Sequence, residues 1–403
     1  MNIAVYTLTS ELHDEHAVTA VTNDFLSSLG FDHEFRGTDY NDYGTHSLDL
    51  IYVRTGGTEG IFRRLLPQLR QQSSRPFFLL TSGKSNSLAA SLEILSYLRQ
   101  QKLSGEVIHG SEAYIHHRVQ LLARVGEIRR QLQGVRLGVV GAPSDWLISS
   151  YADYQVVAQR LGVKLVDLPI EELIGIIAQT PLHDTTENSP SEAIRASLPG
   201  AQQIYEALKA MVSQHHLNGL TLRCFDLLTS VKNTGCLALA KLNSEGIVAG
   251  CEGDVPTLLS MLLAQALTGV SGFQANPARI NPETGELLFA HCTIPLNMVE
   301  RYEFDTHFES GIGVGIRGYM KEGPVTLFKV AGDFSRCFIA EGQLVRNQAQ
   351  PDLCRTQQVI QLDDKRQASY FLTEPIGNHH VIIPGRVGEA LSALFAEMND
   401  IYN

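Results

Sequence analysis

The chain has 403 residues, of which 44% are hydrophobic and 19% are charged, and its formal net charge is −11. This composition is typical of a folded protein with more than one domain, and it argues against a disordered chain. The negative charge argues against nucleic acid or an anionic membrane as the main partner. The sequence has no apolar run long enough to span a bilayer, and its first residues predict a β-strand instead of a signal peptide, so we expect a cytoplasmic protein.

Strand and helix patterns alternate over the first third of the chain. This alternation predicts a parallel sheet with helices on both of its faces. The expected strands lie at 3–8, 48–53, 76–81 and 106–109. The expected helices lie at 16–29, 61–71, 87–101 and 111–133. Gly134 interrupts the last helical pattern, and the first domain is therefore expected to cover 1–134.

A second series of strands and helices follows in residues 135–290. Its expected strands lie at 136–141, 163–167, 219–225 and 246–251. Its expected helices lie at 150–161, 193–215, 234–244 and 256–268. We therefore predict a second domain built like the first, with a Rossmann-like parallel sheet.

The pattern changes after residue 290, where short β-rich runs are separated by turns. These runs lie at 313–319, 325–330, 336–340 and 357–361, and a last helix is expected at 388–398. Runs of this kind are typical of antiparallel hairpins. The predicted fold is therefore α/β, with two Rossmann-like parallel-sheet domains followed by a β-rich, antiparallel barrel-like domain at 291–403.

Glu252 stands at the end of an apolar run that reads as a buried strand. A helix is expected to begin directly after it, because Asp254 suits the N-cap and Pro256 suits the first turn. Open α/β sheets bind ligands just beyond the carboxyl ends of their strands, and Glu252 has that position. A Glu at a strand end can equally be a capping or solvated carboxylate.

Two histidine segments follow Glu252 in the sequence. His291 comes directly after an expected strand, and His379 and His380 lie in a β context in which neighbouring side chains point to opposite faces. At most one of that pair is therefore expected to face a shared site. A carboxylate with imidazoles suits a divalent metal ion, although each His alone could be a core residue. Trp146, the single Trp, also follows a strand and could stack on a sugar ring or cover the sheet edge.

Taken together, these segments resemble the fucose/arabinose ketol-isomerase superfamily, and within it the fucose-isomerase-like proteins. The resemblance rests on 251–254, 290–292, 305–311 and 377–380, and it covers most of the chain in domain order. It implies a metal-dependent aldose–ketose isomerase that uses Mn²⁺ and passes through a cis-enediol. It also implies a small-molecule sugar as the partner and a homo-oligomer, either a trimer or a hexamer.

The resemblance also implies the site residues. Glu252 matches the family's metal-binding acid/base Glu, and a His from the pair His379 and His380 completes the coordination. Asn276 stands 24 residues after Glu252 (276 − 252), where the family has a second carboxylate. An Asn oxygen can bind a metal, but it carries no charge and cannot act as a general base.

The expected metal ligands are therefore Glu252, Asn276, His379 and His380, with catalysis at Glu252 and the Asn276 position. Trp146 and His291 are expected to bind the substrate. Three functions remain open. The chain could isomerise a sugar with Glu252 as the one base, with or without help from Asp254. It could perform other metal-assisted chemistry on a sugar or sugar acid, or it could be a sugar-binding or regulatory relative without isomerase activity.

Overall fold

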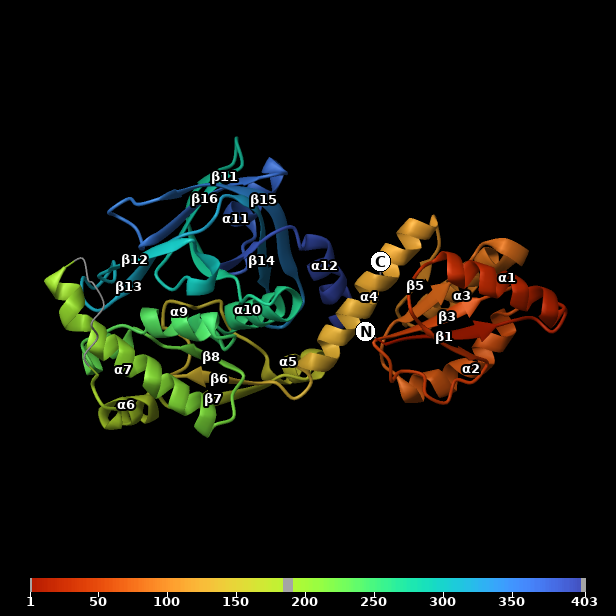
Figure 1. The fold of residues 1–403 in the computed structure, drawn as a ribbon, viewed down its shortest axis with the longest axis horizontal. Helices are drawn as coiled ribbons and strands as arrows, with labels where there is room; N and C mark the ends of the chain where they lie inside the picture. The colour runs from red at the N-terminus through yellow and green to blue at the C-terminus, as the bar shows by residue number, and fades with distance from the viewer. Residues whose placement is uncertain (1, 184–190, 400–403) are drawn as a thin grey trace. The chain divides into compact units, whose positions relative to one another are not determined.

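The computed structural model describes residues 2–183 and 191–399 (Figure 1). Parts of the three predicted domains lie outside the described residues, namely 1, 184–190 and 400–403. The chain forms two compact units, Met1–Gln131 with Ser392–Asn403 and Leu132–Leu391. Among the helices described, none has the length and apolar character that crossing a membrane requires.

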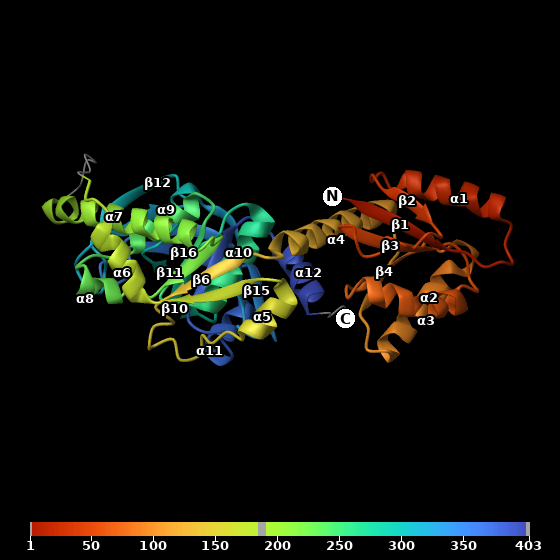
Figure 2. The same cartoon turned by 90° about the horizontal axis from the view of Figure 1, so that it is seen from below.

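The first unit is built on a five-stranded parallel sheet with the order β2-β1-β3-β4-β5. Its strands are β1 (Ile3–Leu8), β2 (Glu34–Gly37), β3 (Leu48–Val53), β4 (Phe77–Leu80) and β5 (Gly105–Ile108). Its helices are α1 (Glu15–Ser28), α2 (Glu59–Gln72), α3 (Ser87–Gln100) and α4 (Glu112–Leu132). Apolar residues of α1 and α4 form the core on one face of the sheet, and those of α2 and α3 form it on the other (Figure 2). Every residue of β1 and β3 is buried, as expected for strands covered on both faces.

The second unit begins with a four-stranded parallel sheet in the order β7-β6-β8-β9. Its strands are β6 (Arg136–Val140), β7 (Lys164–Leu168), β8 (Gly219–Leu222) and β9 (Val248–Cys251). The helices around it are α5 (Tyr154–Leu161), α6 (Ile170–Gln179), α7 (Glu192–Gln214), α8 (Asp226–Ser230), α9 (Cys236–Ser244) and α10 (Val255–Thr268). One apolar core joins this sheet to α6, α7 and α9.

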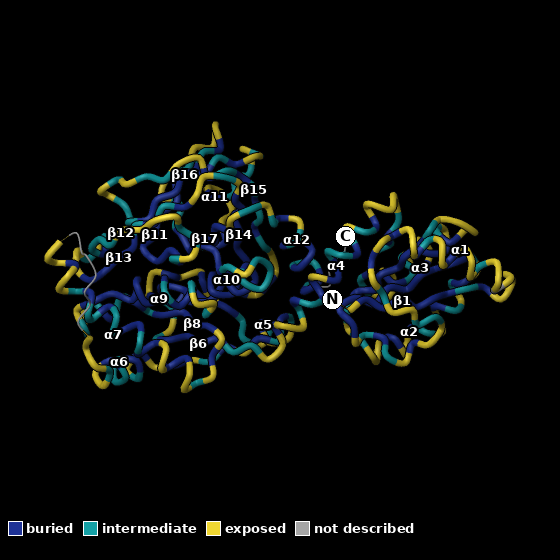
Figure 3. Tube along the Cα trace, in the orientation of Figure 1, coloured by how far each residue is buried: buried dark blue, intermediate teal, exposed yellow. Residues whose placement is uncertain are grey.

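The rest of the second unit is a closed antiparallel barrel with the strand order β10-β11-β16-β15-β14-β17. The barrel strands are β10 (Phe273–Asn281), β11 (Glu286–His291), β14 (Gly323–Val330), β15 (Cys337–Gln348), β16 (Thr356–Leu362) and β17 (His380–Pro384). A separate hairpin pairs β12 (Arg301–Asp305) with β13 (Gly315–Tyr319), and the helices are α11 (Tyr370–Thr373) and α12 (Gly388–Met398). Large apolar side chains such as Phe273 and Phe289 fill the core of the barrel, where the trace is mostly buried (Figure 3).

The predicted fold class is confirmed, since two parallel sheets are followed by an antiparallel barrel. Six elements differ from the sequence prediction: β2, α6, α8, β12 and α11 were not expected, and β10 was not recognised as a strand. Pro277 weakens the strand signal of β10 because it cannot donate to the sheet, and the register shifts between Pro277 and Arg279. The barrel begins with β10 and β11, which cover residues 273–291, and β10 pairs with β17, far away in the sequence.

Candidate metal centre

Glu252 occupies a tight turn between β9 and α10. Its backbone is left-handed, with φ +63°, which is rare and strained for a residue with a side chain. Gly253 is also left-handed, and a Cβ on it would lie 2.3 Å from the backbone oxygen of Ala142. The Ser144 N–H donates to the Glu252 carbonyl oxygen at 2.9 Å. The turn is thus fixed against the loop after β6, which explains how the strained conformation persists.

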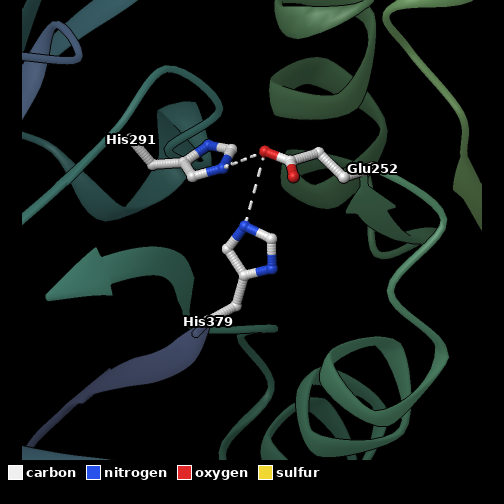
Figure 4. A group of neighbouring side chains, drawn as sticks. All are labelled: Glu252, His291 and His379. Atoms are coloured by element: carbon white, nitrogen blue, oxygen red, sulfur yellow. Dashed lines mark ion pairs between the residues drawn. The ribbon is translucent and has the colours of Figure 1, made fainter. Parts of the chain in front are cut away.

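Three buried side chains converge at this turn (Figure 4). Oε1 of Glu252 lies 3.5 Å from Nε2 of His291 and 3.5 Å from Nε2 of His379. One atom of each residue falls within 4.8 Å of the other two. His291 ends β11 and His379 directly precedes β17, so the barrel supplies both imidazoles and the parallel sheet supplies the carboxylate. Ligands that share one metal ion at about 2.1 Å are about 3.0–3.5 Å apart, so the spacing suits a metal site.

Asp254 determines the orientation of His379. Its Oδ2 lies 2.9 Å from Nδ1 of His379, and its Oδ1 accepts from the Thr257 N–H at 2.8 Å as the N-cap of α10. With Nδ1 engaged in this way, Nε2 faces Glu252, and it has no hydrogen-bond partner among the described residues. A carboxylate on the far nitrogen of a ligand His is a common support for metal binding.

Lys329 of β14 completes this support. Its ammonium group lies 3.3 Å from Oδ2 of Asp254 and also donates to the Thr257 hydroxyl, and its side chain is 1% exposed. Burial and this pairing act against each other, and the net effect holds the Asp254 pKa well below its usual range. The sequence prediction missed Lys329, although a lone charged residue in the apolar strand Gly323–Val330 was a usable signal.

The charges of the cluster balance one another. Burial opposes ionisation of Glu252, yet the charge of His379 and the contacts with both imidazoles hold its pKa well below its usual range. Burial also opposes a charge on His379, but Glu252 and Asp254 raise its pKa to about 9. Burial lowers the pKa of His291. Without a metal, the proton on His379 compensates the carboxylate, so a bound cation would replace that proton.

His379 and His380, which were both expected as ligands, point to opposite sides of the barrel wall. His380 points into the barrel, where its ring contacts Phe289, Phe338 and Phe371. Its Nε2 lies 3.0 Å from the Tyr370 hydroxyl, and burial lowers its pKa to about 3. The prediction that at most one of the two histidines faces the site therefore agrees with the structure, and His380 leaves the ligand set. His291 was expected at the substrate, and the structure instead places it among the candidate ligands.

Two further expected residues lie near the cluster. The Trp146 indole N–H donates to Oε2 of Glu252 at 2.6 Å, while the side chain is 51% exposed. Asn276 belongs to the face of β10 that carries Gln274, whose amide bonds to the backbone of Cys251. The Oδ1 atom of Asn276 is buried and has no hydrogen-bond partner in the described part of the chain. That Asn276 is a ligand stays a prediction.

A scan against models of known protein families found no match for this chain. The chain is similar to curated proteins named sulfoquinovose isomerase. The protein from Alkalicoccus urumqiensis is 23% identical over 261 residues, or 61% of this chain and 59% of that protein. The protein from Clostridium sp. (strain MSTE9) is 24% identical over 315 residues, or 70% and 67% of the two chains. The protein from Priestia aryabhattai is 23% identical over 266 residues, or 61% and 59%, so two of these matches span less than two thirds of the relative's length.

Proposed function

We propose that this protein is an enzyme that interconverts an aldose and a ketose at the end of β9. Glu252, His291 and His379 would hold a divalent cation there. The observation that carries the proposal is the convergence of one buried carboxylate oxygen and two Nε2 atoms. The Nε2 of His379 makes no hydrogen bond with the described residues. The relatives named sulfoquinovose isomerase support the same class of reaction.

The donor set supports Mn²⁺ as the cation. A mixed oxygen and imidazole site suits a first-row divalent ion, and the Oδ1 of Asn276 would add a neutral fourth ligand. When bound, the ion would stabilise negative charge that develops on the sugar oxygens. The chain keeps the ligands in place through Asp254, which holds Nδ1 of His379, and through Trp146, which holds Oε2 of Glu252.

The reaction we propose passes through a cis-enediol. A proton leaves C2 of the aldose and returns to C1, and the hydroxyl proton moves from O2 to O1. Glu252, His291 and His379 are buried, and electrostatic interactions are stronger at buried sites than in water. Such a reaction needs a proton carrier beside C1 and C2, and a neutral Asn276 cannot be that carrier.

The substrate would be a small sugar. A fucose- or arabinose-type sugar is one candidate, and a sulfonated hexose, the substrate named for the relatives, is the other. A cavity of about 340 Å³ lies beside Lys329, and Ser150, Pro256, Arg336 and Gly377 are also in its walls. None of Glu252, His291 and His379 lines it, so this cavity carries no argument about the substrate.

The test is an aldose-to-ketose screen with and without added Mn²⁺, using fucose, arabinose and sulfoquinovose as substrates. We expect Mn²⁺-dependent turnover that Glu252→Gln lowers at least about 100-fold, since the variant loses the one anionic ligand. Glu303→Gln is the matched control, because Glu303 lies on the exposed hairpin, where it pairs with Arg301 and contacts neither Glu252 nor a His in the described part of the chain. Sugar binding without turnover in the parent would instead favour the sugar-binding or regulatory alternative.

A further inference from the structure

The segment between β12 and β13 carries two proton-exchanging side chains that the proposed reaction has not used. His307 is buried, with 7% of its surface exposed, and Glu309 follows two residues later. Nε2 of His307 lies 3.6 Å from Oε2 of Glu309, and Nδ1 lies 2.9 Å from the Ser310 hydroxyl. The two form a His–Glu pair in which the Glu309 side chain is about half exposed.

Ring contacts join this pair to the candidate metal centre. The His307 ring packs edge-to-face on Phe225 at 5.4 Å between centroids, and Phe225 packs edge-to-face on Trp146 at 4.8 Å. Trp146 in turn donates to Oε2 of Glu252. Two ring contacts and one hydrogen bond thus connect His307 to Glu252. Glu309 is also near enough to Glu252 for the charge of Glu252 to raise the Glu309 pKa.

The backbone also holds this segment to the cluster. Arg355 links this segment to Cys292, the residue that follows His291, because its Nε–H donates to the Thr306 carbonyl at 2.7 Å. The backbone N–H of Arg355 donates to the sulfur of Cys292 at 3.5 Å. Within the segment, the His307 N–H donates to the Ile312 carbonyl at 3.1 Å, and the Gly311 N–H donates to the His307 carbonyl at 2.8 Å. Glu309 is thus presented from a fixed turn.

Glu252 is poorly placed to carry the proton itself. Its Oε1 faces both imidazoles, and its Oε2 accepts the Trp146 N–H. We propose that Glu309 is the carboxylate that carries the proton between C2 and C1 of the sugar, in the role that Asn276 cannot fill. His307 would be the positioning residue that holds it. This inference rests on the proposed function.

The proton balance closes without another reactant. In the forward direction the C2–H bond breaks, its proton goes to Glu309, and its electron pair forms the C1–C2 double bond. The former carbonyl oxygen O1 takes the hydroxyl proton of O2. The O2 electrons then form the C2 carbonyl, and the double-bond pair accepts the proton back from Glu309 to form the new C1–H bond.

The acid–base properties of the pair support this role. Burial and the nearby charge of Glu252 both raise the pKa of Glu309. Burial, with a smaller effect of His291, lowers the pKa of His307 to about 4, so this imidazole is neutral at pH 7. A carboxylate with a raised pKa is a stronger base, and it exchanges protons more readily near neutral pH.

The experiment uses the full-length protein and compares Glu309→Gln with the hairpin control Glu303→Gln. We expect Glu309→Gln to lower kcat about 100-fold or more while the calorimetric Kd for Mn²⁺ changes less than about threefold. Formate should restore part of the kcat of Glu309→Ala and none of that of Glu252→Ala, because a small acid can replace a missing proton carrier.

His307→Gln should move the pH profile of kcat, as a positioning residue would. If the parent is active and the kcat of Glu309→Gln lies within about threefold of the parent's, the role of Glu309 is overturned and the proposed function is not. Failure of formate to restore any activity to Glu309→Ala would do the same. An inactive parent that binds Mn²⁺ would overturn the proposed function, and the role of Glu309 with it.

Discussion

A neutral amide at position 276 leaves the candidate centre with Glu252 as its one carboxylate ligand. Ligand charge is a main determinant of the affinity for hard cations, so a second carboxylate should strengthen binding. We expect Asn276→Asp to tighten Mn²⁺ binding by about tenfold, or about 1.4 kcal/mol, as measured by titration calorimetry. Asn276→Leu, which keeps the size and removes the oxygen, should weaken it. Equal affinities in all three proteins would show that residue 276 is not a ligand.

The buried, neutral His307 should make the protein sensitive to acid. Its pKa is about 4 in the folded state and about 6.5 in an unfolded chain. Below pH 6.5 the unfolded state therefore binds a proton that the folded state does not bind, and stability falls as the pH falls from 6.5 to 4. Each pH unit costs up to about 1.4 kcal/mol from this residue. Urea unfolding at several pH values should show a smaller slope for His307→Gln than for the parent, and an unchanged slope would contradict the assignment.

The sequence predicted those site residues that have local signals around them. Glu252 was recognisable because a strand end and a helix N-cap enclose it, and both features are local. His291 was detected, but nothing local distinguished a ligand from a residue that touches substrate. The contact of Asp254 with His379 spans 125 positions, and its contact with Lys329 spans 75, so sequence spacing could not reveal either.

Helix α10 is the element that places the candidate centre. It begins where Glu252 and Gly253 turn the chain, and its N-cap Asp254 is also the support of His379. The sequence predicted this helix and its cap correctly, because an N-cap Asp and an early Pro are strong local signals. It did not predict β10, whose Pro277 and register shift hide the alternation of a strand.

Gly253→Ala tests the turn before α10. The added Cβ would lie 2.3 Å from the backbone oxygen of Ala142. The alanine would also have to keep the left-handed backbone of Gly253, with φ +71°. We expect a loss of about 2 kcal/mol or more in unfolding free energy, together with weaker Mn²⁺ binding. Gly269→Ala at the other end of α10 is the control, since Gly269 has φ +83° but no atom within 4 Å of its added Cβ. That variant should lose only about 1 kcal/mol and bind Mn²⁺ as the parent does. Equal effects of the two changes would contradict a tight turn at Gly253.

At the scale of the whole molecule, the fold class could be predicted from the sequence. In the structure, the parallel sheet of β6–β9 and the barrel form one unit, and the described residues from Ser392 onward belong with the first unit. Both facts depend on pairings between segments far apart in the chain, such as β10 with β17.

The homo-oligomer implied by the family resemblance stays a prediction. Light scattering at micromolar concentration checks it, and a stable monomer would contradict it.

We expect the stability of the first unit to be independent of Mn²⁺ and that of the second unit to depend on it. In the first unit Glu397 is fully buried and pairs with Arg75 at 2.8 Å, and Arg129 lies 3.8 Å away. Arg75→Met leaves that carboxylate with a single, more distant cation, so we expect a loss of about 3 kcal/mol in the stability of this unit. Arg346→Met is the control, because Arg346 and Glu286 form an exposed pair in the second unit that should contribute less than about 1 kcal/mol.

Calorimetric unfolding measures both variants with and without Mn²⁺. Because a ligand stabilises only the folded state that binds it, added Mn²⁺ should raise the unfolding temperature of the second unit in both variants. It should leave the loss caused by Arg75→Met in place. If Mn²⁺ reversed that loss, the metal would be acting on the first unit, and the assignment of the centre to Glu252, His291 and His379 would be wrong.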